Sequence, residues 1–267
     1  MASERPRPSE FDPNVPNIAR MYDYYLGGKD HYQVDRERAE EALVADPTLL
    51  TLIRENRAFL GRAVRYLAEQ GIDQFLDIGT GLPTQQNVHQ IAHSVNPAAR
   101  VVYVDYDEQV VAHGRALLAE SRETRMVQAD LRRPQEILDH PDVNRMLDFS
   151  KPVALLLVAT LHFIPDEDDP HGIMAQLRDA LAPGSHLALT HASADGVPDV
   201  VAKVVEVYKR TSAPGTPRTQ DQVTGLFGDF GMLDPGLVWA PLWRPGRPVS
   251  LEEAVRVWFY AGVGRKS

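Results

Sequence analysis

The chain has 267 residues, which at roughly 150 residues per domain suits one large domain or one domain with an appendage. Its 37 Asp and Glu residues against 28 Lys and Arg give a formal charge of −9, which disfavours nucleic acid as a partner because phosphate backbones attract a basic surface. The chain contains no cysteine, so disulfides, thiolate zinc sites and thiol nucleophiles are excluded.

The N-terminal residues 1–14 are rich in proline and polar side chains, which predicts a disordered lead-in. They contain no apolar core of a signal peptide. The longest apolar stretch, Val153–Ile164, is interrupted by Thr160 and His162 and is far shorter than the roughly 20 residues that span a bilayer. We therefore expect a cytoplasmic protein without a membrane partner.

Residues 15–72 are predicted to be helical. Apolar side chains recur at i, i+3, i+4 and i+7, which is the spacing of one helix face, at Ile18, Met21, Tyr22 and Tyr25. Two glycines, Gly27 and Gly28, end this helix. A longer helix begins at Asp46-Pro47 and ends at Gly71.

From Asp73 onward, short apolar runs alternate with amphipathic helical segments, the pattern of a parallel sheet with crossover helices. The predicted strands are Phe75–Ile78, Val101–Asp105, Thr124–Gln128, Val153–Val158 and His186–Thr190. Thr219 and Gln222 have the spacing of a capping box and open a short helix. Two final strands, Leu237–Ala240 and Val255–Ala261, have no helix between them that the pattern requires, which suits an antiparallel pair.

The strongest local motif is a strand that runs into a glycine turn, with Gly79 and Gly81 directly after Ile78. Glycines in such a turn allow a ligand to approach the backbone closely. The third glycine of a dinucleotide fingerprint would fall at Thr84, so that fingerprint is incomplete. A phosphate-binding P-loop is excluded, because no Gly-Lys-Ser/Thr follows.

Charge indicates which ligand fits this turn. Asp77 lies two residues before Gly79, and no Lys or Arg follows until Arg100. A pyrophosphate would meet a carboxylate without a local cation, whereas a ligand that carries an ammonium and a sulfonium would be favoured. S-adenosylmethionine is such a ligand. The alternative is that Asp77 only caps the turn.

Two further acids follow predicted strands, where ligands of open α/β sheets bind. Asp105 ends the second strand and could accept hydrogen bonds from both ribose hydroxyls. Asp130 follows the third strand and could meet the adenine amino group, with Leu131 packed on the ring. A helix cap is the alternative role for Asp130.

These motifs carry a family resemblance. QFLDIGTGLPT, VVYVDYD, QADLRRP, LLLVATLHFIPDEDDP and LAPGSHLALTH resemble the ordered motifs of class I S-adenosylmethionine-dependent methyltransferases. The preceding PNIARMYDYYLGGKDHYQVDRE and ENRAFLGRAV resemble a mainly actinobacterial family of S-adenosyl methyltransferases that was long described as a domain of unknown function. The resemblance implies a Rossmann-like seven-stranded sheet with an antiparallel last strand over residues 73–267, and an N-terminal helical lid over residues 15–72.

The resemblance also implies roles for single residues. The methionine end of the cofactor would meet Asp77, Gly79 and Gly81, the ribose Asp105, and the adenine Asp130 and Leu131. In the lid segment, Tyr22 and Gly28 are expected to contact the cofactor and Tyr25 the substrate. Ordinary packing of an aromatic stripe is the alternative for these tyrosines. Arg57 is expected to be a solvated residue on its helix face, and the alternative is that it pairs with an acid near the site.

His162 follows the fourth strand, in a segment similar to the Leu-His-Asp-Trp-Ser-Asp-Glu region in which small-molecule O-methyltransferases carry a histidine base. Phe163 replaces the adjacent acid, and a structural role is the alternative for His162. His31 and His191 are further residues that could reach a substrate. The acid run Asp166–Asp169 is interpreted as a solvated helix N-terminus rather than a magnesium site, and no metal is expected.

The sequence therefore predicts a methyltransferase that uses S-adenosylmethionine and acts on a small organic acceptor, most simply by O-methylation with His162 as the candidate general base. One alternative is a catalytically silent S-adenosylmethionine-binding regulatory protein, and a weaker one is an NAD-dependent oxidoreductase. Both a monomer and a homodimer are compatible with the sequence.

Overall fold

The computed structural model describes residues 12–83, 87–119 and 121–267. Thr84 and residues 1–11 of the expected lead-in lie outside these described residues. Within them, no helix is long and apolar enough to cross a bilayer.

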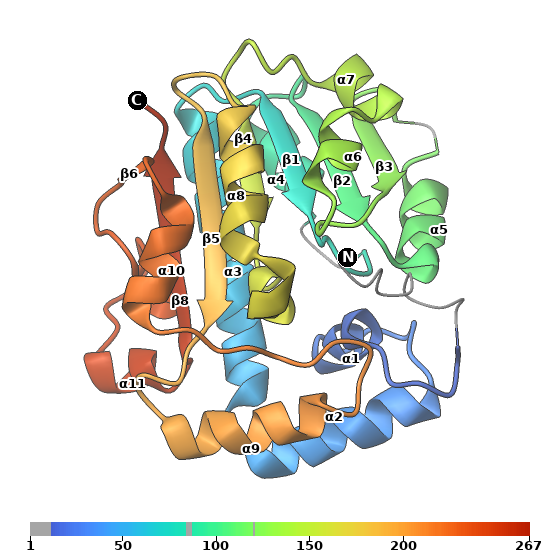
Figure 1. The fold of residues 1–267 in the computed structure, drawn as a ribbon, viewed down its shortest axis with the longest axis vertical. Coiled ribbons are helices and arrows are strands. Elements are labelled where there is room, and N and C mark those ends of the chain that lie inside the picture. The colour runs from blue at the N-terminus through green and yellow to red at the C-terminus, as the bar shows by residue number, and fades with distance from the viewer. Residues whose placement is uncertain (1–11, 84–86, 120) are drawn as a thin grey trace.

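A single sheet organises the chain (Figure 1). Its eight strands are β1 (Gln74–Ile78), β2 (Arg100–Asp105), β3 (Thr124–Gln128), β4 (Ala154–Leu157), β5 (His186–Ala192), β6 (Gly231–Met232), β7 (Val238–Trp239) and β8 (Phe259–Arg265). The order is β3-β2-β1-β4-β5-β8-β6, with β7 also paired to β8. The first five strands are parallel, and β8 runs antiparallel to β5.

The predicted α/β class with an antiparallel last strand is confirmed, with two differences at the C-terminal end. The sheet has eight strands rather than seven, because the two-residue β6 and β7 both pair with β8. The strand predicted at Val255–Ala261 begins only at Phe259. The preceding residues form helix α11 (Leu251–Val255), which the sequence prediction missed although Ser250 and Glu253 make a capping box.

Helices cover both faces of the sheet, and the alternation of side chains along each strand explains how. On β1, Phe75 packs in the cluster with α3 (Leu49–Glu69), α4 (Val88–Val95) and α5 (Glu108–Leu117). Leu76 and Ile78 pack on the opposite face. That face is covered by α6 (Pro134–Leu138), α7 (Pro141–Met146), α8 (Pro170–Asp179) and α10 (Gln220–Phe227).

Three further helices lie beyond the carboxyl ends of the parallel strands. These are α1 (Ile18–Tyr25), α2 (Gln33–Ala45) and α9 (Pro198–Tyr208), and α2 packs against both α1 and α9 (Figure 1). Within the segment 15–72, α3 packs against α4, β5 and β8 and also contacts α1 and α2, so it joins the sheet to these two helices.

The order of the strands fixes the place of a ligand site. Strands β1 and β4 are neighbours, and the chain passes from β1 to β2 on one side of this pair and from β4 to β5 on the other, so the strand order reverses between β1 and β4. In open α/β sheets a crevice forms at such a point, outside the carboxyl ends of the strands. Helices α1 and α9 lie over this crevice.

Candidate functional site

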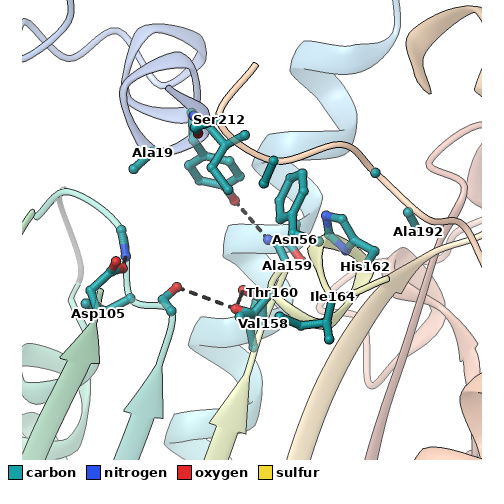
Figure 2. Close-up of a pocket in the computed structure, with 18 of the residues that line it drawn as sticks. Ala19, Asn56, Asp105, Val158, Ala159, Thr160, His162, Ile164, Ala192 and Ser212 are labelled. Atoms are coloured by element: carbon teal, nitrogen blue, oxygen red, sulfur yellow. Dashed lines mark hydrogen bonds between the residues drawn. The ribbon is translucent and has the colours of Figure 1, made fainter. Parts of the chain in front are cut away.

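A cavity opens at the carboxyl ends of β1, β2 and β4 (Figure 2), and residues of α1 and α9 also line it. Seven residues singled out in the sequence line it, namely Tyr22, Asp77, Gly79, Gly81, Asp105, Asp130 and Leu131, and so does His162. Figure 2 shows Asp105 on one side of the cavity and His162 on the opposite side.

The glycine turn after β1 forms the floor of the cavity. Gly79 has a φ of +74° and Gly81 a φ of +67°, a region that L-residues with a Cβ rarely adopt. The Gly79 N–H donates to Val104 O at 2.8 Å, which holds the turn against β2. A Cβ on Gly79 would collide with the Thr160 side chain, whereas one on Gly81 would meet no atom of the described residues within 4 Å.

Two buried carboxylates lie beside this turn, at the ends of adjacent strands. Asp105 accepts a hydrogen bond from the Gly81 N–H at 2.9 Å and another from the Asp107 N–H at 3.0 Å. Burial raises the pKa of Asp77 to about 7 and that of Asp105 to about 6. A buried carboxylate of this kind is stabilised in its charged form by any cationic ligand or hydrogen-bond donor that enters the cavity.

Arg57 on α3 is the cation whose charge acts most strongly on Asp77. It lines the cavity and is half-buried, so the expectation of a solvated arginine is wrong. Its charge lowers the pKa of Asp77, although burial has the larger and opposite effect. Arg57 therefore offsets part of the negative charge at the β1 end of the cavity.

Asp130 and Leu131 lie at the β3 end of the cavity. Asp130 accepts from both Nε and Nη2 of Arg132, and its Oδ1 also accepts from the Arg132 N–H at 2.9 Å. The Asp130 side chain is 20% exposed, so it is both paired and accessible. Leu131 is buried.

Tyr22 is the member of the predicted aromatic stripe that reaches the cavity. Its hydroxyl accepts a hydrogen bond from the Asn56 side-chain amide at 2.8 Å (Figure 2). Asn56 in turn accepts from the Thr190 hydroxyl at 2.7 Å, and Thr190 accepts from the Ala159 N–H at 2.8 Å. This chain of hydrogen bonds connects α1, α3, β5 and the turn after β4.

Three other predicted residues of the N-terminal segment do not line the cavity. Tyr25 is 3% exposed, and its hydroxyl lies 3.5 Å from Ala39 O. His31 Nδ1 lies 3.3 Å from the carboxylate of Asp23, a buried residue of α1. A Cβ on Gly28 would overlap that same carboxylate, so Gly28 accommodates Asp23. These residues therefore pack within the N-terminal segment and lie behind the residues that line the cavity.

His162 lies in the single-turn helix η1 (Leu161–Phe163) and is 5% exposed. Its Nδ1 is buried and has no hydrogen-bond partner among the described residues. Burial lowers the pKa of His162 well below 6.5, and the neighbouring His191 and Arg218 lower it further. The imidazole is therefore neutral at physiological pH and can act as a hydrogen-bond acceptor.

His191 lies beneath His162 rather than in the cavity lining, with their ring centroids 5.6 Å apart. It is fully buried, and its Nδ1 lies 2.7 Å from Ala192 O. Its Nε2 accepts from Arg218 Nη1 at 3.0 Å. Because both ring nitrogens of His191 have partners within the protein, this residue holds the structure beneath the cavity rather than contacting a ligand.

Arg218, which the sequence interpretation overlooked, holds the loop after β4. Besides His191, it donates to Leu161 O at 3.2 Å, to Ile164 O at 2.9 Å and to the Asp166 carboxylate. Within the acid run, Asp169 accepts from the Gly172 N–H at 3.0 Å and caps α8. No metal-binding cluster of three His, Cys, Asp or Glu residues occurs in the described ranges.

Helix α9 supplies cavity residues that the sequence prediction missed, namely Val204, Val205 and Tyr208. A signal was available, because Pro198 stands at the first helical position and Val201, Val204, Val205 and Tyr208 follow with helical spacing. The segment after α9 also lines the cavity, through Ser212, Ala213, Gly215 and Pro217. Its Ser212 N–H donates to Pro16 O at 2.9 Å. We call residues 209–218 the strap.

Comparison with known proteins gives matches over the whole chain. A family model described as S-adenosyl methyltransferase matches residues 4–267. A search of curated proteins finds no match.

Several solved structures are similar. A candidate methyltransferase from Thermobifida fusca YX is 44% identical with a TM-score of 0.91, and the alignment covers 100% of both chains. A DUF574 family protein from Streptomyces avermitilis MA-4680 is 40% identical with a TM-score of 0.91, covering 96% of this chain and 99% of that one. Human N-acetylserotonin methyltransferase, solved in complex with SAM, shares the fold at 14% identity and a TM-score of 0.52, covering 94% of this chain and 63% of that chain.

Proposed function

The chain belongs to the S-adenosyl methyltransferase family, whose methyl donor is S-adenosylmethionine, and from this premise we propose that the cavity binds this cofactor beside a small organic acceptor. The observation that carries the proposal is the pair of buried carboxylates, Asp77 and Asp105, next to the accessible Gly81. A cavity so lined favours a ligand with a positive charge and several hydroxyl donors.

The residues of the cavity fit such a cofactor. Asp77 would accept from its ammonium, and Asp105 from its ribose hydroxyls, because both carboxylates are desolvated and gain from a donor. Gly79 and Gly81 would let the ligand approach the backbone of the turn. Arg57 would meet the carboxylate of the methionine end.

At the β3 end, Asp130 would accept from the adenine amino group while it remains paired with Arg132. Leu131 would pack on the ring. Tyr22 and the strap would cover the bound molecules, so that α1, α2 and α9 act as a lid over the core. Gly28 and Tyr25 support this lid without touching the ligands.

When bound, the cofactor supplies an activated methyl group on its sulfonium sulfur, so the protein mainly aligns the acceptor with that methyl. His162 would hold the acceptor hydroxyl, and its neutral imidazole accepts the hydrogen bond. We propose O-methylation on this basis. Because the pKa of His162 is low, the imidazole does not keep a proton that it takes from the hydroxyl group. That proton passes to solvent.

Calorimetric titration of the purified protein with S-adenosylhomocysteine, beside NAD, tests the cofactor site. We expect saturable binding of S-adenosylhomocysteine, and binding of NAD alone would overturn the proposal. Incubation with methyl-labelled S-adenosylmethionine and a panel of small acceptors then tests catalysis. Cofactor binding without any methyl transfer would instead support a regulatory S-adenosylmethionine-binding protein.

A further inference from the structure

The cavity is divided by charge. Its described lining includes seven charged residues, namely Asp23, Arg57, Asp77, Asp105, Asp107, Asp130 and Arg132. They come from helices α1 and α3, from strands β1 and β2, and from the loops after β2 and β3. We call this side the charged half. It is the part of the cavity that the proposed cofactor site occupies.

The other side is built by the loop after β4, the end of β5, helix α9, the strap and the start of β8. We call it the neutral half, because none of its described lining residues is charged. The side chains that matter most here are His162, Phe163, Ala192, Val204, Val205 and Phe259. This is where an acceptor would lie if the charged half holds the cofactor.

Aromatic rings form one wall of the neutral half. The His162 ring centroid lies 4.3 Å from that of Phe163 and 5.1 Å from that of Phe259. Phe163 in turn stacks on Tyr208 with an interplanar angle of 22°. Such a wall binds flat apolar rings well, because aromatic surfaces gain from offset or edge contacts beyond simple burial.

The arginine that contacts the residues of this half cannot serve a ligand. Arg218 is 4% exposed, and its donors are directed to Leu161 O, Ile164 O, Asp166 and His191. His162 is neutral, since burial lowers its pKa well below 6.5. An anionic acceptor would therefore lose its hydration without finding a counter-ion, and a cationic one would find no carboxylate.

The strap lines the neutral half and limits the size of the acceptor. The strap is tied to the N-terminal segment through the Ser212 N–H, which donates to Pro16 O at 2.9 Å, and to η1 through the Thr216 N–H, which donates to His162 O at 2.7 Å. A peptide or nucleic-acid strand would have to break these contacts to reach His162. A small molecule can be enclosed by them.

We infer that the acceptor is a small, neutral, mainly aromatic molecule with a hydroxyl group, bound with its ring in the neutral half and its hydroxyl at His162. This inference rests on the proposed function. In the transfer, the hydroxyl oxygen forms a bond to the methyl carbon as the carbon–sulfur bond breaks, and the hydroxyl proton is released to solvent through His162. The sulfur keeps the electron pair of the broken bond, so that S-adenosylhomocysteine results.

The test uses matched probes on the full chain saturated with S-adenosylhomocysteine. Binding of 1-naphthol and 4-phenylphenol is compared by calorimetry with that of 1-naphthoate and biphenyl-4-carboxylate, which have similar rings and a negative charge. We expect at least one phenol to bind about tenfold more tightly than its carboxylate, because the neutral half leaves an anion unpaired. Equal or tighter binding of both carboxylates, or no saturable phenol binding, overturns the inference.

A charge placed in the neutral half sharpens the test. Val205→Lys adds a cation to the cavity wall, whereas Val200→Lys adds one to the same helix outside the lining. We expect Val205→Lys to remove the preference for phenols and Val200→Lys to retain it. Both variants should bind S-adenosylhomocysteine as the unaltered chain does. If S-adenosylhomocysteine fails to bind the unaltered protein, the proposed function is refuted, whereas an unchanged preference in Val205→Lys refutes only the location of the acceptor.

Discussion

The Asn56 side-chain amide donates a hydrogen bond to the Tyr22 hydroxyl at 2.8 Å, and this contact joins α3 of the core to α1 above the cavity. Asn56 is 1% exposed and also accepts from the Thr190 hydroxyl at 2.7 Å. Because Thr190 accepts from the Ala159 N–H at the turn after β4, one buried amide fixes two walls of the cavity relative to each other.

Replacing Asn56 by leucine leaves the Thr190 hydroxyl and the Tyr22 hydroxyl without this partner. A buried group that loses its hydrogen bond costs about 1–3 kcal/mol, so Asn56→Leu should lower the free energy of unfolding by about that amount in urea titrations. Arg54→Leu, on the exposed side of the same helix, is the control and should change it by about 0.5 kcal/mol or less. Equal losses in both variants would contradict the role of the chain of hydrogen bonds.

Asp105→Ala tests the proposed ribose contact. Removal of a charged acceptor should weaken S-adenosylmethionine binding by about 1.5–3 kcal/mol in calorimetry, the usual contribution of a hydrogen bond to a charged group. Asp73→Asn is the matched control, because Asp73 is exposed at the opposite end of β1. An unchanged affinity in Asp105→Ala would remove Asp105 from the site.

The strand-end acids could be predicted from the sequence because each lies at or within two residues of the end of a strand whose apolar run is evident. Asp77, Asp105 and Asp130 all line the cavity for that reason. Partners distant in the chain could not be predicted in this way. Asn56 meets Thr190 across 134 positions, and no local pattern marks that pair.

The two halves of the cavity also differ in how far they could be predicted from local sequence patterns. The glycine turn is a local motif, whereas the neutral half is assembled from segments that follow β4, β5 and α9. Arg218 shows the difference most clearly, since its partners Leu161 and Ile164 lie more than fifty positions earlier in the chain. Tyr25 was expected at the substrate from the family resemblance, but of the two tyrosines on this helix face only Tyr22 reaches the cavity, because a helix face is wider than the part of it that lines a site.

The pH dependence of cofactor binding follows from Asp77. Burial raises its pKa to about 7, and a bound ammonium would stabilise the carboxylate and lower that pKa in the complex. The complex then holds fewer protons than the free protein, so affinity for S-adenosylhomocysteine should fall as pH drops from 7.5 to 5.5, by up to about tenfold per unit below pH 7.

Calorimetry in two buffers of different ionisation enthalpy should detect proton release on binding near pH 6.5. Asp77→Asn is the control, and it should bind more weakly and lose the pH dependence between 7.5 and 6.5, because the remaining carboxylate, Asp105, has a pKa of only about 6. The raised pKa of Asp77 also affects folding stability, because the folded protein retains this proton to a higher pH than the unfolded chain does. Its stability should therefore decline as pH rises from about 4 to about 7. Proton uptake on binding would contradict the assignment of Asp77.

His162→Ala tests the alignment of the acceptor. Turnover with any acceptor that the unaltered protein methylates should fall by about 100-fold, the scale of a lost acid–base or orienting group, while affinity for S-adenosylhomocysteine changes little. His186→Ala is the control, since His186 lies at the opposite end of β5 from the cavity. Because the pKa of His162 is well below 6.5, the rate should show no titration of this residue between pH 6.5 and 8. A fall in cofactor affinity as large as the fall in turnover would contradict this role.

The two glycines of the turn should respond differently to alanine. Both adopt a left-handed backbone conformation, which costs a residue with a Cβ about 1–2 kcal/mol. Gly79→Ala adds a collision with Thr160, whose hydroxyl is held by Ile78 O at 3.2 Å. Gly79→Ala should therefore lower the free energy of unfolding by more than Gly81→Ala.

A double-mutant cycle separates the collision from the backbone strain. Thr160→Ala removes the atoms nearest to the added Cβ, so the double variant Gly79→Ala/Thr160→Ala should be more stable than the sum of the two single losses predicts. Combined with Gly81→Ala, Thr160→Ala should give additive losses, because no described atom lies within 4 Å of a Cβ there. Gly81→Ala should act mainly on S-adenosylhomocysteine affinity, since its methyl group would extend from the floor of the cavity. Additive losses for the Gly79 pair would show that strain alone, and not Thr160, requires glycine at this position.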